Sequence, residues 1–270
     1  MDIEPLLKRI REVISVSIDD VKIYDKTWGN FVVEINNKWI FRFSKSEESK
    51  KLLLKEKLFL SEFAESAPIE IPRILFSEDD FIAYQKIEGE ALTPSVFEKL
   101  SNSAKENIAK DLALFLLWLH KLDFKSSEIR VIETPDKKLF MRKFEKLSNT
   151  LSPVAKVNAD KYFREFDFDM FKNLNKILIH NDFGEGNILI NKDRVSGIID
   201  FGRLMYGYPE MDFAKLWRNF GKEFAKAVVE FCGYDQERFE FIGRYDLFQR
   251  EEPFYDKIEK IFGESIKNFY

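Results

Sequence analysis

The sequence predicts an α+β fold in two lobes, with a β-rich N-terminal part and a mainly helical C-terminal part. Between residues 21 and 84, five short runs are rich in β-branched and aromatic residues, with one helical segment among them. After a hinge near residues 85–90, apolar residues recur mostly at helical spacing. A chain of 270 residues has room for two such lobes. We expect them to be residues 1–86 and 87–270.

The first lobe is expected to hold two helices and two hairpins. Residues 5–14 have the apolar spacing of an amphipathic helix. Asn36 and Asn37 separate two β-rich runs, and such a pair is typical of a tight hairpin turn. Residues 46–63 are charged and rich in leucine at helical spacing, and prolines follow them, which predicts a second helix. The expected strands are residues 21–24, 31–35, 39–43, 74–76 and 81–84.

The second lobe is expected to be helical around a small island of strands. A long apolar helix is predicted over residues 103–122, and the chain from Pro209 onward reads as helical. Residues 191–194 form a turn signal inside the island. Two further helices are expected at 136–147 and 157–168, and strands at 177–179, 187–190 and 195–199.

Composition excludes several classes of protein. The chain has 43 Lys and Arg against 47 Asp and Glu, and the net charge of −4 argues against a nucleic-acid partner. Its single cysteine, Cys232, leaves no intrachain disulfide. Its two histidines, His120 and His180, are too far apart for a zinc-binding HExxH motif, and we expect His120 to meet the dipole of a helix C-terminus. The longest apolar stretch, residues 112–119, falls short of the ~20 residues that span a bilayer, so we expect no membrane partner. With its unpaired cysteine we expect a cytoplasmic protein, and we expect it to be a monomer.

The residues that carry chemistry lie in the strand island. His180-Asn-Asp182 leaves a buried strand, Asn187 follows five residues after Asp182, and Asp200-Phe-Gly202 begins thirteen residues later. The intervening hairpin should bring Asn187 and Asp200 to the same end, where an amide and a carboxylate oxygen suit Mg²⁺. Asp182 could accept a proton from an alcohol, and His180 is expected to brace the loop. This set predicts phosphoryl transfer rather than hydrolysis.

The pattern H-x-D-x-x-x-x-N followed by D-F-G resembles the kinase-like phosphotransferases of small molecules. It is most similar to the aminoglycoside phosphotransferases, in particular the branch that modifies the 2″-hydroxyl. Residues 28–35 look like the family's nucleotide loop, 39–43 its third strand, 85–89 its hinge, and 109–120 its long helix. The resemblance covers most of the chain and implies a bilobal protein-kinase-like fold, with a nucleotide-binding lobe over 1–86 and a catalytic and substrate-binding lobe over 87–270.

The resemblance also implies roles for individual residues. Asp182 is similar to the catalytic aspartate that orients or deprotonates the acceptor hydroxyl. Asn187 and Asp200 look like the Mg²⁺ ligands. Arg42 stands where the family often has a phosphate-contacting lysine, and Glu56 looks like the helix glutamate that holds this cation; a plain strand–helix ion pair is the alternative for these two.

The nucleotide site implied by the resemblance draws on two more segments. Trp28 and Gly29 belong to the nucleotide loop. Gln85 and Ile87 would meet the base through their backbone, and Tyr84 would be the bulky residue at the back of the base pocket. The resemblance implies ATP or GTP as the donor, and both stay open.

The implied acceptor is an aminoglycoside, a polycation whose enzymes line the cleft with carboxylates. Candidates for those contacts are Glu223, Glu251 and Glu252. The weak acidity of the C-terminal part keeps a second reading open, in which the acceptor is another small alcohol of the choline, sugar, thioribose or homoserine type. A third reading is a silent nucleotide-binding module, and the presence of Asp182, Asn187 and Asp200 together argues against it.

Overall fold

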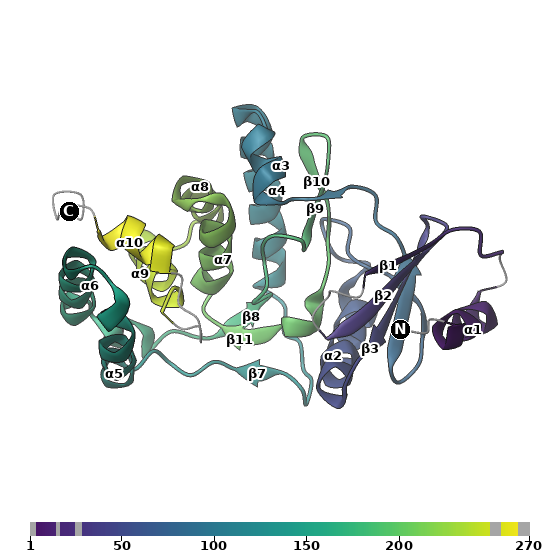
Figure 1. Ribbon diagram of the computed structural model, residues 1–270, viewed down its shortest axis with the longest axis horizontal. Helices are drawn as coiled ribbons and strands as arrows, with labels where there is room; N and C mark the ends of the chain where they lie inside the picture. Colours follow the sequence, from purple (N-terminus) through teal and green to yellow (C-terminus); the bar gives the residue numbers. More distant parts are fainter. Residues whose placement is uncertain (1–3, 15–16, 25–28, 249–254, 264–270) are drawn as a thin grey trace.

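The computed structural model describes residues 4–14, 17–24, 29–248 and 255–263. The molecule is elongated, with an antiparallel sheet near one end and a group of helices at the other (Figure 1). The sheet contains β1 (Val21–Tyr24), β2 (Asn30–Ile35), β3 (Trp39–Ser44), β5 (Phe81–Gln85) and β4 (Ile74–Ser77), in that spatial order. These strands lie within a residue or two of the predicted ones, and Asn36 and Asn37 both take the positive φ that a tight hairpin turn requires.

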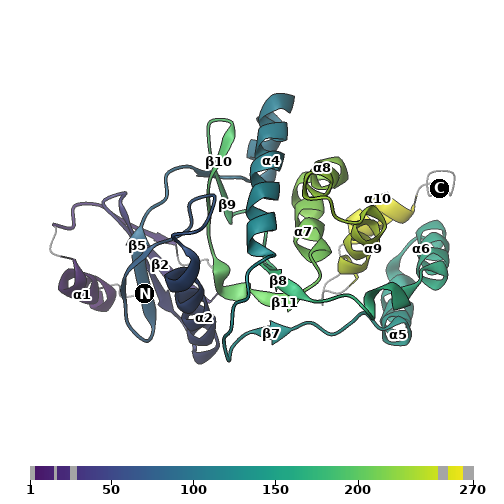
Figure 2. The ribbon, with the colours of Figure 1, turned by 180° about the vertical axis from the view of Figure 1, so that it is seen from behind.

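The two faces of this sheet pack against different helices, because successive side chains of a strand point to opposite faces. Phe41 and Phe43 of β3 pack with α1 (Glu4–Val13) in one apolar cluster. The residue between them, Arg42, lies on the opposite face, where Leu53 of α2 (Glu47–Phe63) packs on Ile82. Both ribbon views place α1 at the outer end of the molecule and α2 toward its centre (Figures 1 and 2).

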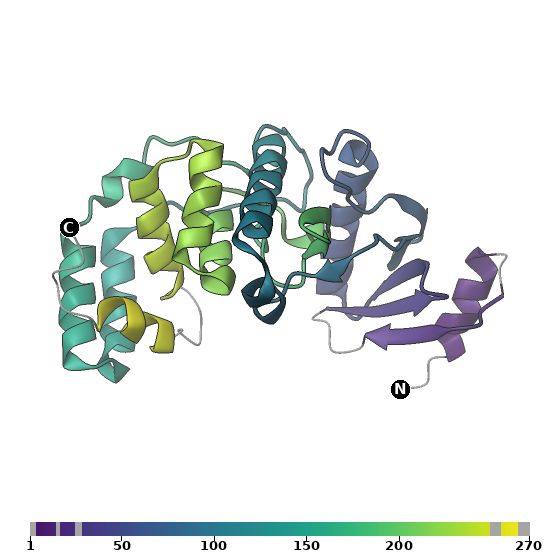
Figure 3. The same ribbon diagram turned by 90° about the horizontal axis from the view of Figure 1, so that it is seen from above.

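The C-terminal part is built from helices around two three-stranded sheets. One sheet has the order β10 (Arg194–Ile198), β9 (Ile188–Asn191), β6 (Glu90–Ala91). The other has the order β7 (Arg130–Val131), β11 (Met205–Gly207), β8 (Ile177–Ile179). The helices are α3 (Pro94–Lys99), α4 (Asn102–Leu119), α5 (Lys137–Leu147), α6 (Pro153–Glu165), α7 (Glu210–Phe220), α8 (Lys222–Cys232), α9 (Gln236–Asp246) and α10 (Tyr255–Phe262). Seen from above, many of them lie side by side (Figure 3).

Differences from the predicted elements have local causes. Helix α6 begins at Pro153 rather than at residue 157, because Ser152 caps it by accepting a hydrogen bond from Ala155 N and proline suits the first turn. Strands β6, β7 and β11 were not predicted, because each is two or three residues long and gives no period-2 pattern. The short helix α3 was also missed.

Aromatic clusters account for the abundance of phenylalanine. Phe59 of α2 stacks on Phe201 with ring centroids 5.0 Å apart, and Phe115 of α4 stacks on Phe183 at 5.8 Å. This cluster joins α2 to the C-terminal part, beneath the loop that carries Asp182. A separate cluster at the far end joins α5, α6, α9 and α10. No helix in the described part of the chain is long and apolar enough to cross a bilayer.

Candidate active site

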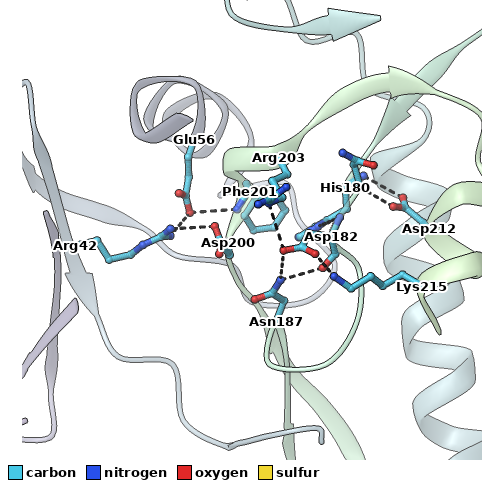
Figure 4. A network of polar contacts seen from close by, with 11 residues as sticks. Arg42, Glu56, His180, Asp182, Asn187, Asp200, Phe201, Arg203, Asp212 and Lys215 are labelled. Carbon is cyan, nitrogen blue, oxygen red and sulfur yellow. Dashed lines mark hydrogen bonds and ion pairs between the residues drawn. The ribbon is translucent and has the colours of Figure 1, made fainter. Parts of the chain in front are cut away.

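The hairpin of β9 and β10 brings Asn187 and Asp200 to one end, as the spacing predicts (Figure 4). Ile188 pairs with Ile198, and the N–H of Ile199 donates to the carbonyl of Asn187 at 2.9 Å. Asp200 takes a φ of 67°, a left-handed conformation that is uncommon for a residue with a side chain. Such strain is characteristic of functional positions.

Asp182 lies beside Asn187 and between two cations. The amide of Asn187 donates to the Asp182 carbonyl at 2.9 Å and to its Oδ2 at 3.2 Å. The ammonium of Lys215, from α7, forms an ion pair with Oδ1, and Nε of Arg203 lies 3.8 Å from Oδ2 (Figure 4). Burial acts to raise the pKa of Asp182, but Lys215 and the other nearby cations outweigh burial and lower it. The carboxylate is therefore charged at neutral pH and ready to accept a hydrogen bond.

A buried carboxylate from α7 holds the loop that carries Asp182. Asp212 accepts hydrogen bonds from the backbone N–H groups of His180 at 3.0 Å and Asn181 at 2.8 Å. The ring of His180 accepts from the N–H of Asp182 at 3.3 Å, and burial lowers its pKa, so it stays neutral and acts as a brace. His120 caps α4, but its ring also lies 3.2 Å from Asp212. The sequence predicted that His120 interacts with the helix dipole, but it did not predict this contact with Asp212.

Arg42 connects the N-terminal sheet to the hairpin. Its guanidinium donates to Glu56 of α2 at 2.6 Å and to Asp200 at 2.9 Å. Glu56 also accepts from the N–H of Phe201 at 3.2 Å. Burial raises the pKa of Glu56 to about 7, while Arg42 opposes this shift. The predicted pair thus exists, and it also reaches Asp200, which a plain strand–helix ion pair would not do.

Arg42, Glu56 and Asp200 line one cavity of about 620 Å³ between the sheet and the hairpin. Tyr84 and Ile87 lie in its wall, and burial raises the pKa of the Tyr84 hydroxyl to about 12. Gln85 is exposed and does not line the cavity, whereas its neighbour Lys86 does. Further lining residues from the predicted set are Gly29, Asp182 and Asn187. Trp28 lies outside the described residues.

The residues predicted to contact the acceptor do not join Asp182 in the part of the chain that the structure describes. Glu223, near the start of α8, lines a separate hollow with Phe97 and Lys105. Glu251 and Glu252 lie outside the described residues. Lys215 and Asp212, which approach the loop from α7, were not predicted from the sequence. The sequence holds no local signal for this approach: a Cβ at Gly184 would lie 2.7 Å from the Lys215 Cγ, but that closeness depends on how α7 packs.

The donor set fits Mg²⁺ held together with a phosphate group. Asn187 and Asp200 supply oxygens at the edge of the cavity, and the Asp200 side chain is 42% exposed. Among the described residues, no group of three or more His, Cys, Asp and Glu side chains could form an all-protein cage. Magnesium is often held by one or two protein oxygens plus phosphates and water, so the residues present suit that mode.

Comparisons with known proteins show the family and the fold. The model of the phosphotransferase enzyme family, APH, matches residues 20–241. The solved GDP and kanamycin complex of APH(2″)-IIIa is 20% identical, with a TM-score of 0.74 over 97% of this chain and 98% of that one. The streptomycin–ATP complex of APH(2″)-IIa is 23% identical, with a TM-score of 0.70 over 96% and 90%. A macrolide 2′-phosphotransferase from Brachybacterium faecium is 12% identical, with a TM-score of 0.68 over 91% and 88%. The likeness confirms the predicted kinase-like fold.

Proposed function

The chain belongs to the phosphotransferase enzyme family, and on that premise we propose that it transfers the γ-phosphate of ATP or GTP to a hydroxyl of a small molecule, with Mg²⁺. The main observation behind this proposal is that one cavity is lined by Asp182, Asn187, Asp200 and Arg42. Phosphoryl transfer asks the protein mainly to position the groups and to offset charge, and this set supplies both.

Each side chain has a role in the proposed reaction. The Asp182 carboxylate accepts the hydroxyl proton as the acceptor oxygen forms its bond to the γ-phosphorus and the bond to the nucleoside diphosphate breaks. Arg42 neutralises phosphate oxygens with its fork of donors and is held by Glu56. Magnesium, when bound through Asn187 and Asp200, supplies further neutralisation of phosphate charge.

The nucleotide is proposed to lie in the cavity between the two lobes, residues 1–86 and 87–270. Gly29, which lines this cavity, takes a positive φ of 83°, and glycine there lets the backbone approach a phosphate. Tyr84 and Ile87 form an apolar wall that suits a base. Both features serve ATP and GTP alike.

An aminoglycoside is the first acceptor that we propose. The support is the likeness in fold to phosphotransferases solved with kanamycin, streptomycin and gentamicin. A second candidate is another small alcohol, such as choline, a sugar, a thioribose or a homoserine-like compound. The positive charges of Lys215 and Arg203 at Asp182 favour the less charged members of this group, because they repel a polycation at the point of transfer.

The decisive experiment is a coupled assay of nucleotide turnover. Kanamycin-type and gentamicin-type aminoglycosides are run beside choline and sugars, each with ATP and with GTP. The proposal expects one acceptor class to accelerate turnover, and Asp182→Asn to remove that acceleration. No acceleration by any aminoglycoside contradicts the first acceptor. Transfer that survives Asp182→Asn contradicts the assigned site.

A further inference from the structure

A second cavity lies next to the catalytic loop, and basic side chains dominate it. Its volume is about 200 Å³, several times the roughly 30 Å³ that a water molecule takes in the liquid. Arg203 and Leu52 line both this cavity and the larger one, so the two are neighbours. Its charged lining is Lys51 and Lys55 of α2, Arg130 of β7, Arg203, and two carboxylates, Glu48 and Glu128. The cations outnumber the carboxylates by two.

Lys55 is the unusual member of this set, because it is a buried cation that forms no ion pair with the residues the structure describes, although Glu128 and Glu56 act on it from a longer distance. Its exposed fraction is 3%, and its Nζ donates to the carbonyl of Leu204 at 2.7 Å. The other buried Lys and Arg side chains in the described ranges each pair with a carboxylate. These pairs are Arg42 with Glu56, Arg218 with Asp246, and Arg244 with Glu240. A buried ammonium that forms no ion pair is costly. Burial and the nearby Arg130 lower the pKa of Lys55 to about 8.

The hydrogen bond of Lys55 to the Leu204 carbonyl does not explain why cations from three segments of the chain lie together in this cavity. Lys55 comes from α2, Arg130 from β7, and Arg203 follows the D-F-G motif. Guanidinium groups match the geometry of phosphate oxygens, and they bind them more directionally than an ammonium does. Arg130 is exposed and forms no ion pair with the residues the structure describes, so its donors are available to a bound anion.

We propose that this cavity binds a phosphate-class oxyanion, either inorganic phosphate or a phosphate monoester. The anion supplies the close ion-pair partner that Lys55 lacks among the described residues, and Arg130 and Arg203 complete its contacts. Since Arg203 also lies 3.8 Å from Asp182, an anion held here stands beside the catalytic loop. This site goes beyond the proposed transfer and does not require it.

Titration calorimetry with inorganic phosphate tests the site on the full chain. The larger cavity is first filled with Mg²⁺ and a β,γ-imido nucleotide, and chloride at equal ionic strength serves as the blank. We expect saturable binding of phosphate. Lys55→Met and Arg130→Gln should each weaken it by about tenfold or more, since each removes a charged hydrogen bond.

Matched control variants separate this effect from general loss of charge. Lys57→Met on α2 and Arg142→Gln on α5 change residues that do not line the cavity, and they should bind phosphate as the unchanged chain does. Arg130 is exposed, so Arg130→Gln should fold, and it still tests the site if Lys55→Met does not fold. Absence of saturable binding, or equal binding by the Arg130 and Arg142 variants, overturns the proposal. If the nucleotide fails to bind, the proposed function fails, but this comparison of variants still decides the second site.

A further arm identifies the source of the anion. Glycerol 3-phosphate is titrated beside inorganic phosphate under the same conditions. Tighter binding of the monoester supports an acceptor that carries its own phosphate group, and equal binding supports free phosphate. If Arg130→Gln binds neither inorganic phosphate nor glycerol 3-phosphate, this supports the assignment of the anion site to this cavity.

Discussion

Asp182 owes its charge state to neighbours that lie far away in the sequence. Burial alone would favour the protonated acid, and the ammonium of Lys215, 33 residues along the chain, reverses this. Asn187 holds the same carboxylate from the other side, at 3.2 Å. The side chain is therefore both ionised and fixed in direction before any substrate arrives.

Replacement of Asp182 by Asn or Ala should abolish transfer and leave nucleotide binding nearly intact. The substituted side chain can no longer accept the hydroxyl proton, a loss worth about 10²–10⁴-fold in rate. Steady-state kcat and the dissociation constant of the nucleotide check this. A loss of nucleotide affinity as large as the loss of rate would contradict the role of Asp182.

Lys215→Met should lower kcat by roughly 10–100-fold, because it removes a positive charge from the place where phosphate charge is transferred. Lys215→Arg should recover part of the rate, and the KM for the nucleotide should change little in both variants. An unchanged kcat in Lys215→Met would limit the lysine to a structural role.

Lys55 gives the molecule a pH dependence with a defined sign. Its pKa is lowered to about 8 in the folded chain from 10.5, so the unfolded chain binds more protons between these values. Its contribution to the free energy of unfolding should therefore rise as the pH rises from about 8 to 10.5. Urea titrations should show this rise in the unchanged chain relative to Lys55→Met. The same pH dependence in both would show that other groups cause it.

Helix α2 links the sheet to the hairpin through one buried ion pair. Glu56 is fully buried, and its loss would leave Arg42 with only the partly exposed Asp200 as a partner. Glu56→Ala should cost about 3–5 kcal/mol in the free energy of unfolding, as the breaking of buried pairs does. Glu56→Gln should cost less, since an amide oxygen still accepts from Arg42. Urea unfolding measures both, and equal stability of all three chains would contradict the importance of this pair.

The elements also show what a single sequence reveals about this fold. Helix ends and hairpin turns depend on neighbours in the chain, so Asn36 and Asn37 were enough to place a turn. Strand β6 has two residues and forms by pairing with β9, about a hundred residues later, so no local pattern reveals it. The same holds for the site: a motif predicted Asp182, Asn187 and Asp200, whereas the approach of Lys215 depends on how α7 packs.

At the scale of the whole molecule, the larger cavity is lined by both the N-terminal sheet and the C-terminal hairpin. A nucleotide bound there contacts both parts, and at 100 times its dissociation constant it should add about 2.7 kcal/mol to stability. Thermal unfolding with Mg²⁺ and ATP or GTP should therefore shift upward. EDTA should remove much of the shift, and Asp200→Asn should make it insensitive to EDTA. A shift that EDTA leaves unchanged in the unmodified chain would contradict the metal site.

The carboxylate of Asp212 also has a consequence for the order of folding. It joins the loop at His180 and Asn181 to the end of α4 at His120, across separations of up to 92 residues. Contacts so distant in the chain form late, because closing a long loop costs entropy first. During refolding, helical content should thus return before α7 has fastened this loop, and catalytic competence should be the last property that the chain regains.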